Sequence, residues 1–325
     1  MKTETNRGIL IFAHNNTEID YLGLALTNAL LIQKNLGLTK HQITIVTDPH
    51  SLKYKIKDVG KRFINKCTSN IIEVEKDRDF KLKNNRIYKD TSHTSKSLSF
   101  YNINRCDAYE LSPYDETIMI DADYLILSNA LNHCWGHKNN LMMNWEYVDI
   151  MRGRRYQELD RLSPLGVSMY WATVVYFRKD TTCETFFNFV KHVKNNREYY
   201  SDLYKFNNSV YRNDYSFSIA AHMLSGYKDK GVAQLPMKLY KTWDLDDVHK
   251  VTGLNTLALL LEKPRSPGDF IVTHWRDVDI HIMNKWALNR VSKDMLQYLG
   301  VNNGTKTTTT KTTRKRKTKK ATSTG

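Results

Sequence analysis

The stretch TIMIDADYLIL, residues 117–127, sets two carboxylates, Asp121 and Asp123, inside a long apolar run. A carboxylate in an apolar strand is unfavourable unless it is paired with a cation or bound to a metal. In an extended chain residues i and i+2 point to the same side, so both carboxylates can face one ligand if the strand stays extended there. Such oxygen ligands suit Mg²⁺ or Mn²⁺, which also bind substrate phosphates. The alternative is an ordinary strand end, with Asp121 capping a turn and Asp123 in solvent.

Strand-like and helix-like segments alternate upstream of this stretch. GILIF at 8–12 and ITIVT at 43–47 indicate buried strands, and 71–74 indicates a third. Between the first two, residues 21–36 have the apolar spacing of a helix. This order predicts an α/β fold with a mostly parallel, Rossmann-like central sheet flanked by helices on both faces. Ligands in such folds bind at the carboxyl ends of the strands.

The remaining segments are less regular. Residues 76–97 are polar and show no clear period, which predicts a long loop or lid, and residues 98–111 predict a helix. Leu141 to Asn144 begins another strand. In the second half we expect strands at 167–178, 269–273 and 278–283 and helices at 183–195 and 214–224.

The formal net charge of the 325-residue chain is +15, and it is unevenly distributed. Residues 301–325 hold eight Lys or Arg, ten Thr and no acidic residue. Subtracting those eight charges from +15 leaves +7 on the first 300 residues. A low-complexity Thr/Lys segment cannot compensate the entropy lost on ordering, so we expect a disordered basic tail over 301–325. A cationic chain of this kind favours a polyanionic partner.

Several classes of protein are excluded at this stage. A body with 41% hydrophobic residues is not intrinsically disordered. The longest apolar stretch, near residues 22–32, falls short of the roughly 20 residues that cross a bilayer. The first residues, MKTETNRG, do not resemble a secretory signal. Four cysteines stand far apart, without the close pairs of zinc or redox sites, so a reducing cytoplasm is the expected location.

Residues 111–127, LSPYDETIMIDADYLIL, resemble the DxD region of nucleotide-sugar glycosyltransferases with the GT-A fold, particularly the glycogenin-like and galactosyltransferase-like families. Residues 9–21, ILIFAHNNTEIDY, resemble their first strand and turn. The likeness covers about the first 150 residues and reappears weakly to Trp286. It implies one GT-A domain over 1–300, with a nucleotide-sugar-binding half at 1–150 and an acceptor-binding half at 151–300. It also implies a set of donor-binding residues: Asp121, Ala122 and Asp123 at the metal and diphosphate, and Ala13, His14, Asn15 and Asp48 near the nucleoside.

In these families a late histidine completes the metal site and a lysine meets the phosphates. Residues 279–286, DIHIMNKW, look like a shortened form of that motif without its Gly and Pro, which implies His281 as the third ligand and Lys285 at the phosphates. His274 is the alternative ligand, and either histidine could instead be a half-buried structural residue. Arg105 stands where related enzymes place a cation over the diphosphate.

The resemblance also implies an acceptor side. Asp214 resembles the acidic residue that many of these enzymes place near the acceptor, which makes it the candidate catalytic carboxylate, a base for the acceptor hydroxyl where one is used. A first-turn position at a helix explains it equally well. Trp171, Ala172 and Thr173 stand where relatives carry a small or amide pair facing the sugar, so the choice of sugar and the stereochemistry stay open.

The resemblance implies a hexosyl- or pentosyltransferase that uses Mn²⁺ or Mg²⁺ and a nucleotide-sugar donor, with a UDP-sugar favoured. Together with the charge, it leads to the hypothesis of a phage-type enzyme acting on hydroxymethylated bases in DNA, in the host cytoplasm. Two alternatives stay open: a glycosyltransferase acting on a surface glycan, lipid or protein, and a non-catalytic nucleic-acid-binding protein with the same fold.

Overall fold

The structure is a computed structural model that describes residues 6–75, 84–151, 154, 160–163, 166–207 and 209–301. The tail predicted beyond residue 301 and the first part of the predicted loop, residues 76–83, lie outside the described residues.

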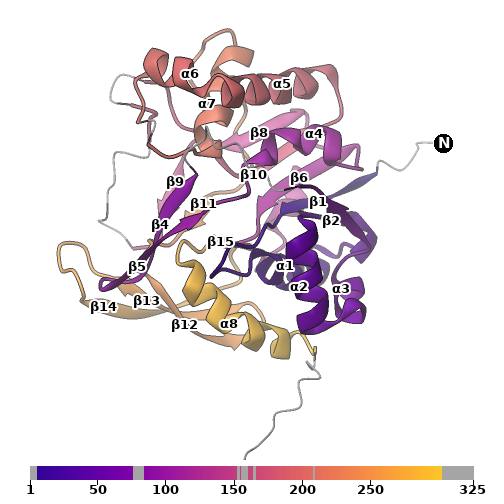
Figure 1. The fold of residues 1–325 in the computed structure, drawn as a ribbon, viewed down its shortest axis with the longest axis vertical. Coiled ribbons are helices and arrows are strands. Elements are labelled where there is room, and N and C mark those ends of the chain that lie inside the picture. The colour runs from indigo at the N-terminus through magenta and orange to yellow at the C-terminus, as the bar shows by residue number, and fades with distance from the viewer. Residues whose placement is uncertain are drawn as a thin grey trace, which may run out of the picture.

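A six-stranded sheet in the order β3-β2-β1-β6-β10-β8 forms the centre of the molecule (Figure 1). Four neighbouring strands are parallel, and β10 runs antiparallel to β6 and β8. The prediction of an α/β fold with a mostly parallel central sheet is therefore confirmed. The strands are β1 (Arg7–Phe12), β2 (Ile43–Thr47), β3 (Asn70–Glu73), β6 (Glu116–Asp121), β8 (Leu141–Asn144) and β10 (Trp171–Arg178).

Two hydrophobic cores lie on opposite faces of this sheet. Along β1, Ile9 and Ile11 belong to one core, whereas Leu10 and Phe12 belong to the other. Helices α1 (Tyr21–Leu36) and α8 (Lys285–Tyr298) pack on the first face, and α5 (Thr181–Asn195) and α7 (Asn213–Leu224) on the second. Because both faces are covered, the strands are apolar throughout rather than alternating, which is why they were recognisable as buried strands.

Local chemistry sets the ends of the first helices. The Asp20 carboxylate accepts a hydrogen bond from the Gly23 amide at the start of α1, and Gly37 ends the helix with a φ of 70°. Asp48 caps α2 (Pro49–Val59) in the same way, with Pro49 at the first helical position. Helix α2 begins almost directly after the carboxyl end of β2, and α1 follows the carboxyl end of β1 after residues 13–20. Both helices therefore begin at the edge where the candidate site lies.

Two smaller sheets lie beside the central one. One has the order β7-β15-β11-β9 and the other the order β12-β13-β14. Helix α8 packs beside β12, at the bottom of the view in Figure 1. The strands are β7 (Tyr124–Leu125), β9 (Tyr147–Asp149), β11 (Leu239–Lys241), β12 (Asp247–Gly253), β13 (Thr256–Glu262), β14 (Phe270–Arg276) and β15 (Ile280–His281), and the remaining helical segments are α3 (Lys61–Cys67), α6 (Arg197–Tyr204), η1 (Lys40–Gln42) and η3 (Ala130–Cys134).

Residues 117–127 are not one strand. The segment splits into β6 and β7, which belong to different sheets, with a turn at 122–123 between them. The apolar run gave no sign of this break, because both pieces are buried. Asp121 is the last residue of β6, and Asp123 lies in the turn.

Two expectations for residues 76–111 were wrong in their described part. Residues 85–99 form a hairpin of β4 (Asn85–Thr91) and β5 (Thr94–Ser99), not a loop. Only Tyr88 and Leu98 of this hairpin are buried. Its strands therefore lack the alternation of apolar and polar residues by which a half-buried strand is predicted. The predicted helix at 98–111 is reduced to η2 (Asn104–Asp107) and α4 (Ala108–Leu111). Before it, Asn102 makes tertiary bonds instead, accepting from the His14 amide at 2.8 Å and, through its carbonyl, from Asn213 at 2.8 Å.

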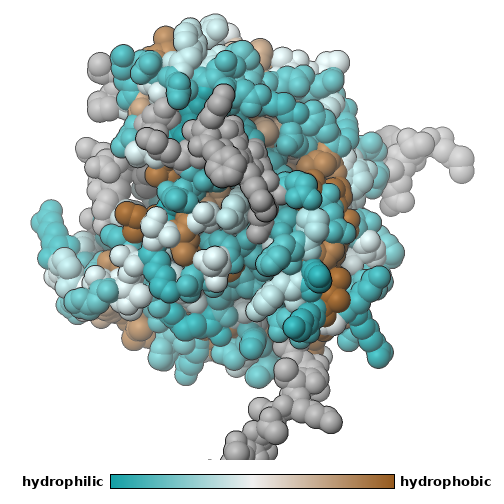
Figure 2. Space-filling model, in the orientation of Figure 1, coloured by the Kyte–Doolittle hydropathy of each residue, from teal (hydrophilic) through white to brown (hydrophobic). Residues whose placement is uncertain are grey.

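The face of the molecule drawn in Figure 2 is largely hydrophilic, with hydrophobic residues in small groups. Within the described ranges, every helix is too short or too polar to span a membrane.

Candidate functional site

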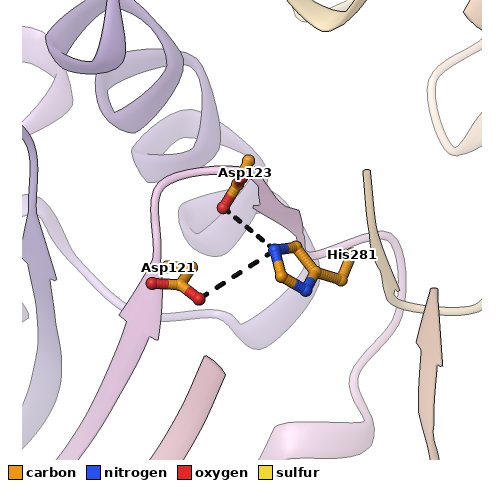
Figure 3. A group of neighbouring side chains, drawn as sticks. All are labelled: Asp121, Asp123 and His281. Carbon is orange, nitrogen blue, oxygen red and sulfur yellow. Dashed lines mark ion pairs between the residues drawn. The ribbon is translucent and has the colours of Figure 1, made fainter. Parts of the chain in front are cut away.

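Asp121, Asp123 and His281 meet at the edge of the central sheet (Figure 3). His281 Nε2 lies 3.3 Å from Asp123 Oδ1 and 3.9 Å from Asp121 Oδ2. One possible ligand atom from each residue lies within 4.8 Å of the other two. The three side chains could therefore hold one metal ion, although the chain between the two aspartates is a turn rather than the extended strand assumed from the sequence.

Strand pairing brings the histidine to the carboxylates. In the small sheet His281 of β15 lies opposite Tyr124 of β7, and the Ile282 amide donates to the Asp123 carbonyl at 3.0 Å. The His281 Nδ1 atom lies 3.4 Å from the Thr173 hydroxyl. His274, the alternative ligand, lies exposed on β14 opposite Ala258 and is not part of this group.

Each carboxylate also has a cationic partner. Arg105 Nη1 lies 2.6 Å from Asp121 Oδ1, and Lys285 Nζ lies 2.7 Å from Asp123 Oδ2. Burial raises the pKa of Asp121, and the opposing effect of Arg105 does not cancel the rise. Burial also acts to raise the pKa of Asp123, but Lys285 and His281 outweigh it and the pKa is lowered. Asp123 is therefore held as an anion at the centre of the group.

Arg105 retains unused hydrogen-bond donors. Its side chain is 3% exposed, and its Nε and Nη2 atoms have no hydrogen-bond partner among the described residues. Buried donors without partners are unfavourable, so this guanidinium is suited to a further anionic group.

The four residues predicted near the nucleoside lie together at the ends of β1 and β2. His14 Nδ1 lies 3.4 Å from Asp48 Oδ2, and both residues are buried. Ala13 is buried too, and its carbonyl accepts from the Thr47 hydroxyl. The Asn15 side chain accepts from the Leu22 amide at 2.8 Å and donates to Asp20 at 2.9 Å. These side chains therefore also build the turn that starts α1 and α2.

A pocket of about 430 Å³ extends from Asp121, Asp123 and His281, which we call the metal group because they could hold an ion. Its described lining includes both aspartates, His281 and Lys285, and Asn102 connects it to the His14 amide. Arg86 and Tyr88 of the β4–β5 hairpin contribute to one wall, with the Tyr88 hydroxyl 3.0 Å from that of Tyr21. Another part of the lining consists of Trp171, Thr173, Val210, Arg212, Asp214 and Asp244.

Asp214 lines this pocket, but both its oxygens have partners. Oδ1 accepts from the Ala172 amide at 3.0 Å, and Oδ2 lies 2.9 Å from Arg212 Nη2. Burial acts to raise its pKa, whereas Arg212 and the Ala172 amide lower it, and the net pKa is lowered. Asp214 lies in the first turn of α7. Asp214 therefore lines the pocket and also occupies the first turn of a helix, so both expectations from the sequence describe its position.

Sequence reasoning missed several residues of the pocket wall. Arg212 and Asp244 lie in segments without an apolar period, and nothing in the chain pointed to them. Behind this wall Lys241 is buried, with its amine 4.0 Å from the centre of the Tyr147 ring and 4.7 Å from that of Trp171. Burial and the nearby Arg212 lower the pKa of Lys241 to about 8. A lysine flanked by aromatic residues in LYKTW was the one available signal.

No protein-family model matches the chain, and no curated protein matches it in sequence. Among solved structures it is similar to the galactosyltransferase LgtC in complex with donor and acceptor sugar analogues, with 14% identity and a TM-score of 0.41 over 70% of this chain and 72% of that chain. For the glycosyltransferase GlyE of Streptococcus pneumoniae TIGR4 the identity is 12% and the TM-score 0.39, over 72% of this chain and 46% of that chain. For mouse xyloside xylosyltransferase 1 the identity is 13% and the TM-score 0.36, over 68% of this chain and 83% of that chain.

Proposed function

We propose that this chain is a metal-dependent glycosyltransferase of the GT-A type, which moves a hexosyl or pentosyl group from a nucleotide sugar to an acceptor hydroxyl. The observation that carries the proposal is the meeting of Asp121, Asp123 and His281 in a pocket at the carboxyl edge of a mostly parallel sheet. Each carboxylate there also has a cation beside it, Arg105 at Asp121 and Lys285 at Asp123. That edge is where α/β folds bind nucleotides.

The residues present fit a divalent ion. Two carboxylates and one imidazole are a donor set for Mn²⁺ or Mg²⁺ that leaves positions for phosphate oxygens and water. When bound, the metal stabilises the charge that develops on a departing diphosphate. We assign Arg105 and Lys285 to the same diphosphate, because both cations are already at the carboxylates and Arg105 has spare buried donors.

The finer assignments follow the resemblance of residues 9–21 and 111–127. We assign Ala13, His14, Asn15 and Asp48 to the nucleoside side, Asp214 to the acceptor side, and a UDP-sugar as the donor. Residues 1–150 then form the donor half and 151–300 the acceptor half of one domain, in an enzyme of the cytoplasm. The acceptor is proposed to be a hydroxymethylated base in DNA, modified by a phage-type enzyme. Only the net charge of +15 supports this choice of acceptor.

The donor reaction is tested with radiolabelled nucleotide sugars. We expect the parent protein to hydrolyse at least one of them with Mn²⁺ and none after chelation. Asp123→Ala should lower that hydrolysis at least about 100-fold while the far-ultraviolet circular dichroism stays unchanged, because one metal ligand is lost. Asp202→Ala, at an exposed position of α6, is the matched control. A parent protein that hydrolyses no nucleotide sugar supports the non-catalytic binding protein instead.

The acceptor is tested in the same assay with hydroxymethylcytosine DNA, plain DNA and glycans. We expect label to enter hydroxymethylcytosine DNA alone, and DNA binding to weaken between low and moderate salt as counterions are released. Label in a glycan would contradict the DNA acceptor and leave the donor chemistry standing.

A further inference from the structure

Four carboxylates among the described residues line the pocket, and one of them differs from the rest. Asp121 is paired with Arg105, Asp123 with Lys285, and Asp214 with Arg212. Asp244 makes neither a hydrogen bond nor an ion pair with any residue that the structure describes, although its half-buried side chain faces the same pocket. Within the described part of the chain, both of its oxygens are therefore open to a ligand.

The loop that carries Asp244 is held firmly. It follows β11, and the Thr242 amide donates to the His281 carbonyl at 3.0 Å, so the loop is tied to the strand of the metal group. Two residues beyond Asp244, the buried Asp246 accepts from the Trp243 amide at 2.6 Å. Arg154 in turn binds both oxygens of Asp246, at 2.7 and 2.8 Å. A carboxylate on such a loop is presented to the pocket in a fixed position.

The surroundings of Asp244 are cationic. Its charge interacts through space with both Arg212 and the buried Lys241. Neither cation forms a hydrogen bond or an ion pair with Asp244, because Arg212 is paired with Asp214 and the Lys241 amine has no hydrogen-bond partner among the described residues. Asp214 differs from Asp244 because both of its oxygens have partners, the Ala172 amide and the Arg212 guanidinium.

We propose that Asp244 is the carboxylate that accepts the proton of the acceptor hydroxyl, a role that rests on the proposed glycosyltransferase function. In the transfer step the acceptor oxygen bonds to the anomeric carbon and the bond from that carbon to the diphosphate breaks. The bonding electron pair leaves with the diphosphate, and the acceptor's proton passes to Asp244. Asp214 then acts by positioning Arg212 and the backbone at Ala172.

Hydrolysis of the donor tests this role, because water then replaces the unidentified acceptor. Asp244→Asn should lower hydrolysis about 100-fold or more, the usual contribution of a general base. Added azide needs no base, so it should restore donor turnover in this variant to within about tenfold of the parent and form the glycosyl azide. Asp214→Asn should also lose turnover, but azide should not restore it. Asp202→Asn is the control for loss of a surface carboxylate.

Binding measurements distinguish the loss of a base from the loss of donor binding. The affinity of Asp244→Asn for UDP with Mn²⁺ should stay within about threefold of the parent, and Asp244→Ala should behave alike, since the side chain holds no partner that folding requires. Azide rescue of Asp214→Asn alone, unchanged hydrolysis in Asp244→Asn, or lost UDP binding in that variant would each overturn the inference. A parent protein without hydrolysis refutes the proposed function itself, and the inference falls with it.

Discussion

The two ends of the pocket differ in how the chain builds them. We call the end with Asp121, Asp123 and His281 the metal end, and the end with Arg212, Asp214 and Asp244, where we propose that the acceptor binds, the acceptor end. At the metal end, Asp121 is the last residue of β6, Asp123 directly precedes β7 and His281 lies in β15, so paired strands set all three positions. At the other end, Arg212 and Asp244 lie outside the named strands and helices, and Asp214 opens a helix. The metal end can therefore be read from strand patterns, whereas the acceptor end depends on tertiary contacts between distant segments.

The two ends also treat charge differently. Asp121 and Asp123 each have a cation at 2.6 to 2.7 Å, which balances the negative charge of the half-buried Asp121 and of the buried Asp123. At the acceptor end Arg212 pairs with Asp214, while Lys241 and Asp244 have no hydrogen-bonding partner among the described residues. Asp244 lines the pocket, where a substrate can supply the missing contact, whereas the Lys241 amine lies behind the wall against the rings of Tyr147 and Trp171.

The largest expected effect comes from breaking the support of the acceptor end. Arg154 binds Asp149 and Asp246, and all three side chains are buried. Arg154→Met leaves both carboxylates buried without their cation, so the free energy of unfolding should fall by about 3–5 kcal/mol, measured by urea denaturation. Arg161→Met removes an exposed arginine 3.7 Å from Asp229 and should cost less than about 1 kcal/mol. Equal effects of the two changes would show that the Arg154 cluster does not support this end.

The second prediction concerns the metal end. His281→Ala should weaken Mn²⁺ binding by more than about 100-fold, because changes even beyond the ligands themselves cost 10- to 100-fold. His274→Ala should leave the affinity unchanged, since that side chain lies exposed on β14. Titration of both variants with Mn²⁺, followed by calorimetry or by the paramagnetic signal of free Mn²⁺, gives the measurement. A loss in His274→Ala alone would place the third ligand elsewhere.

What the sequence could predict follows the same division. The buried strands β1, β2 and β6 and the helix α1 were predictable because each is a continuous apolar or periodic segment. The pair Asp121 and Asp123 stood out because a carboxylate in an apolar run needs a partner. The β4–β5 hairpin was missed because its faces are mostly exposed and need no alternation, and Asp244 was missed because its role depends on Arg154, which lies 90 residues earlier in the chain.

The smallest expected effect is a pH dependence at the acceptor end. Burial, and after it Arg212, lowers the pKa of Lys241 to about 8 from an ordinary value of 10.5, against the opposing charges of Asp244, Asp149 and Asp214. Between these two values the unfolded chain binds more protons than the folded one, so this lysine makes folding more favourable as the pH rises. From pH 7 to pH 9 the parent should gain about 1 to 2 kcal/mol in unfolding free energy relative to Lys241→Met.

The measurement is urea denaturation of both proteins at several pH values in that range, with Lys138→Met as the control for an exposed lysine. Parallel curves for the parent and Lys241→Met would mean that Lys241 keeps its proton throughout. The aromatic rings of Tyr147 and Trp171 would then stabilise its charge as fully as water does. A rise confined to the parent means instead that the acceptor end contains an amine that loses its proton near pH 8. The positive charge that acts on Asp244 would then decrease above that pH.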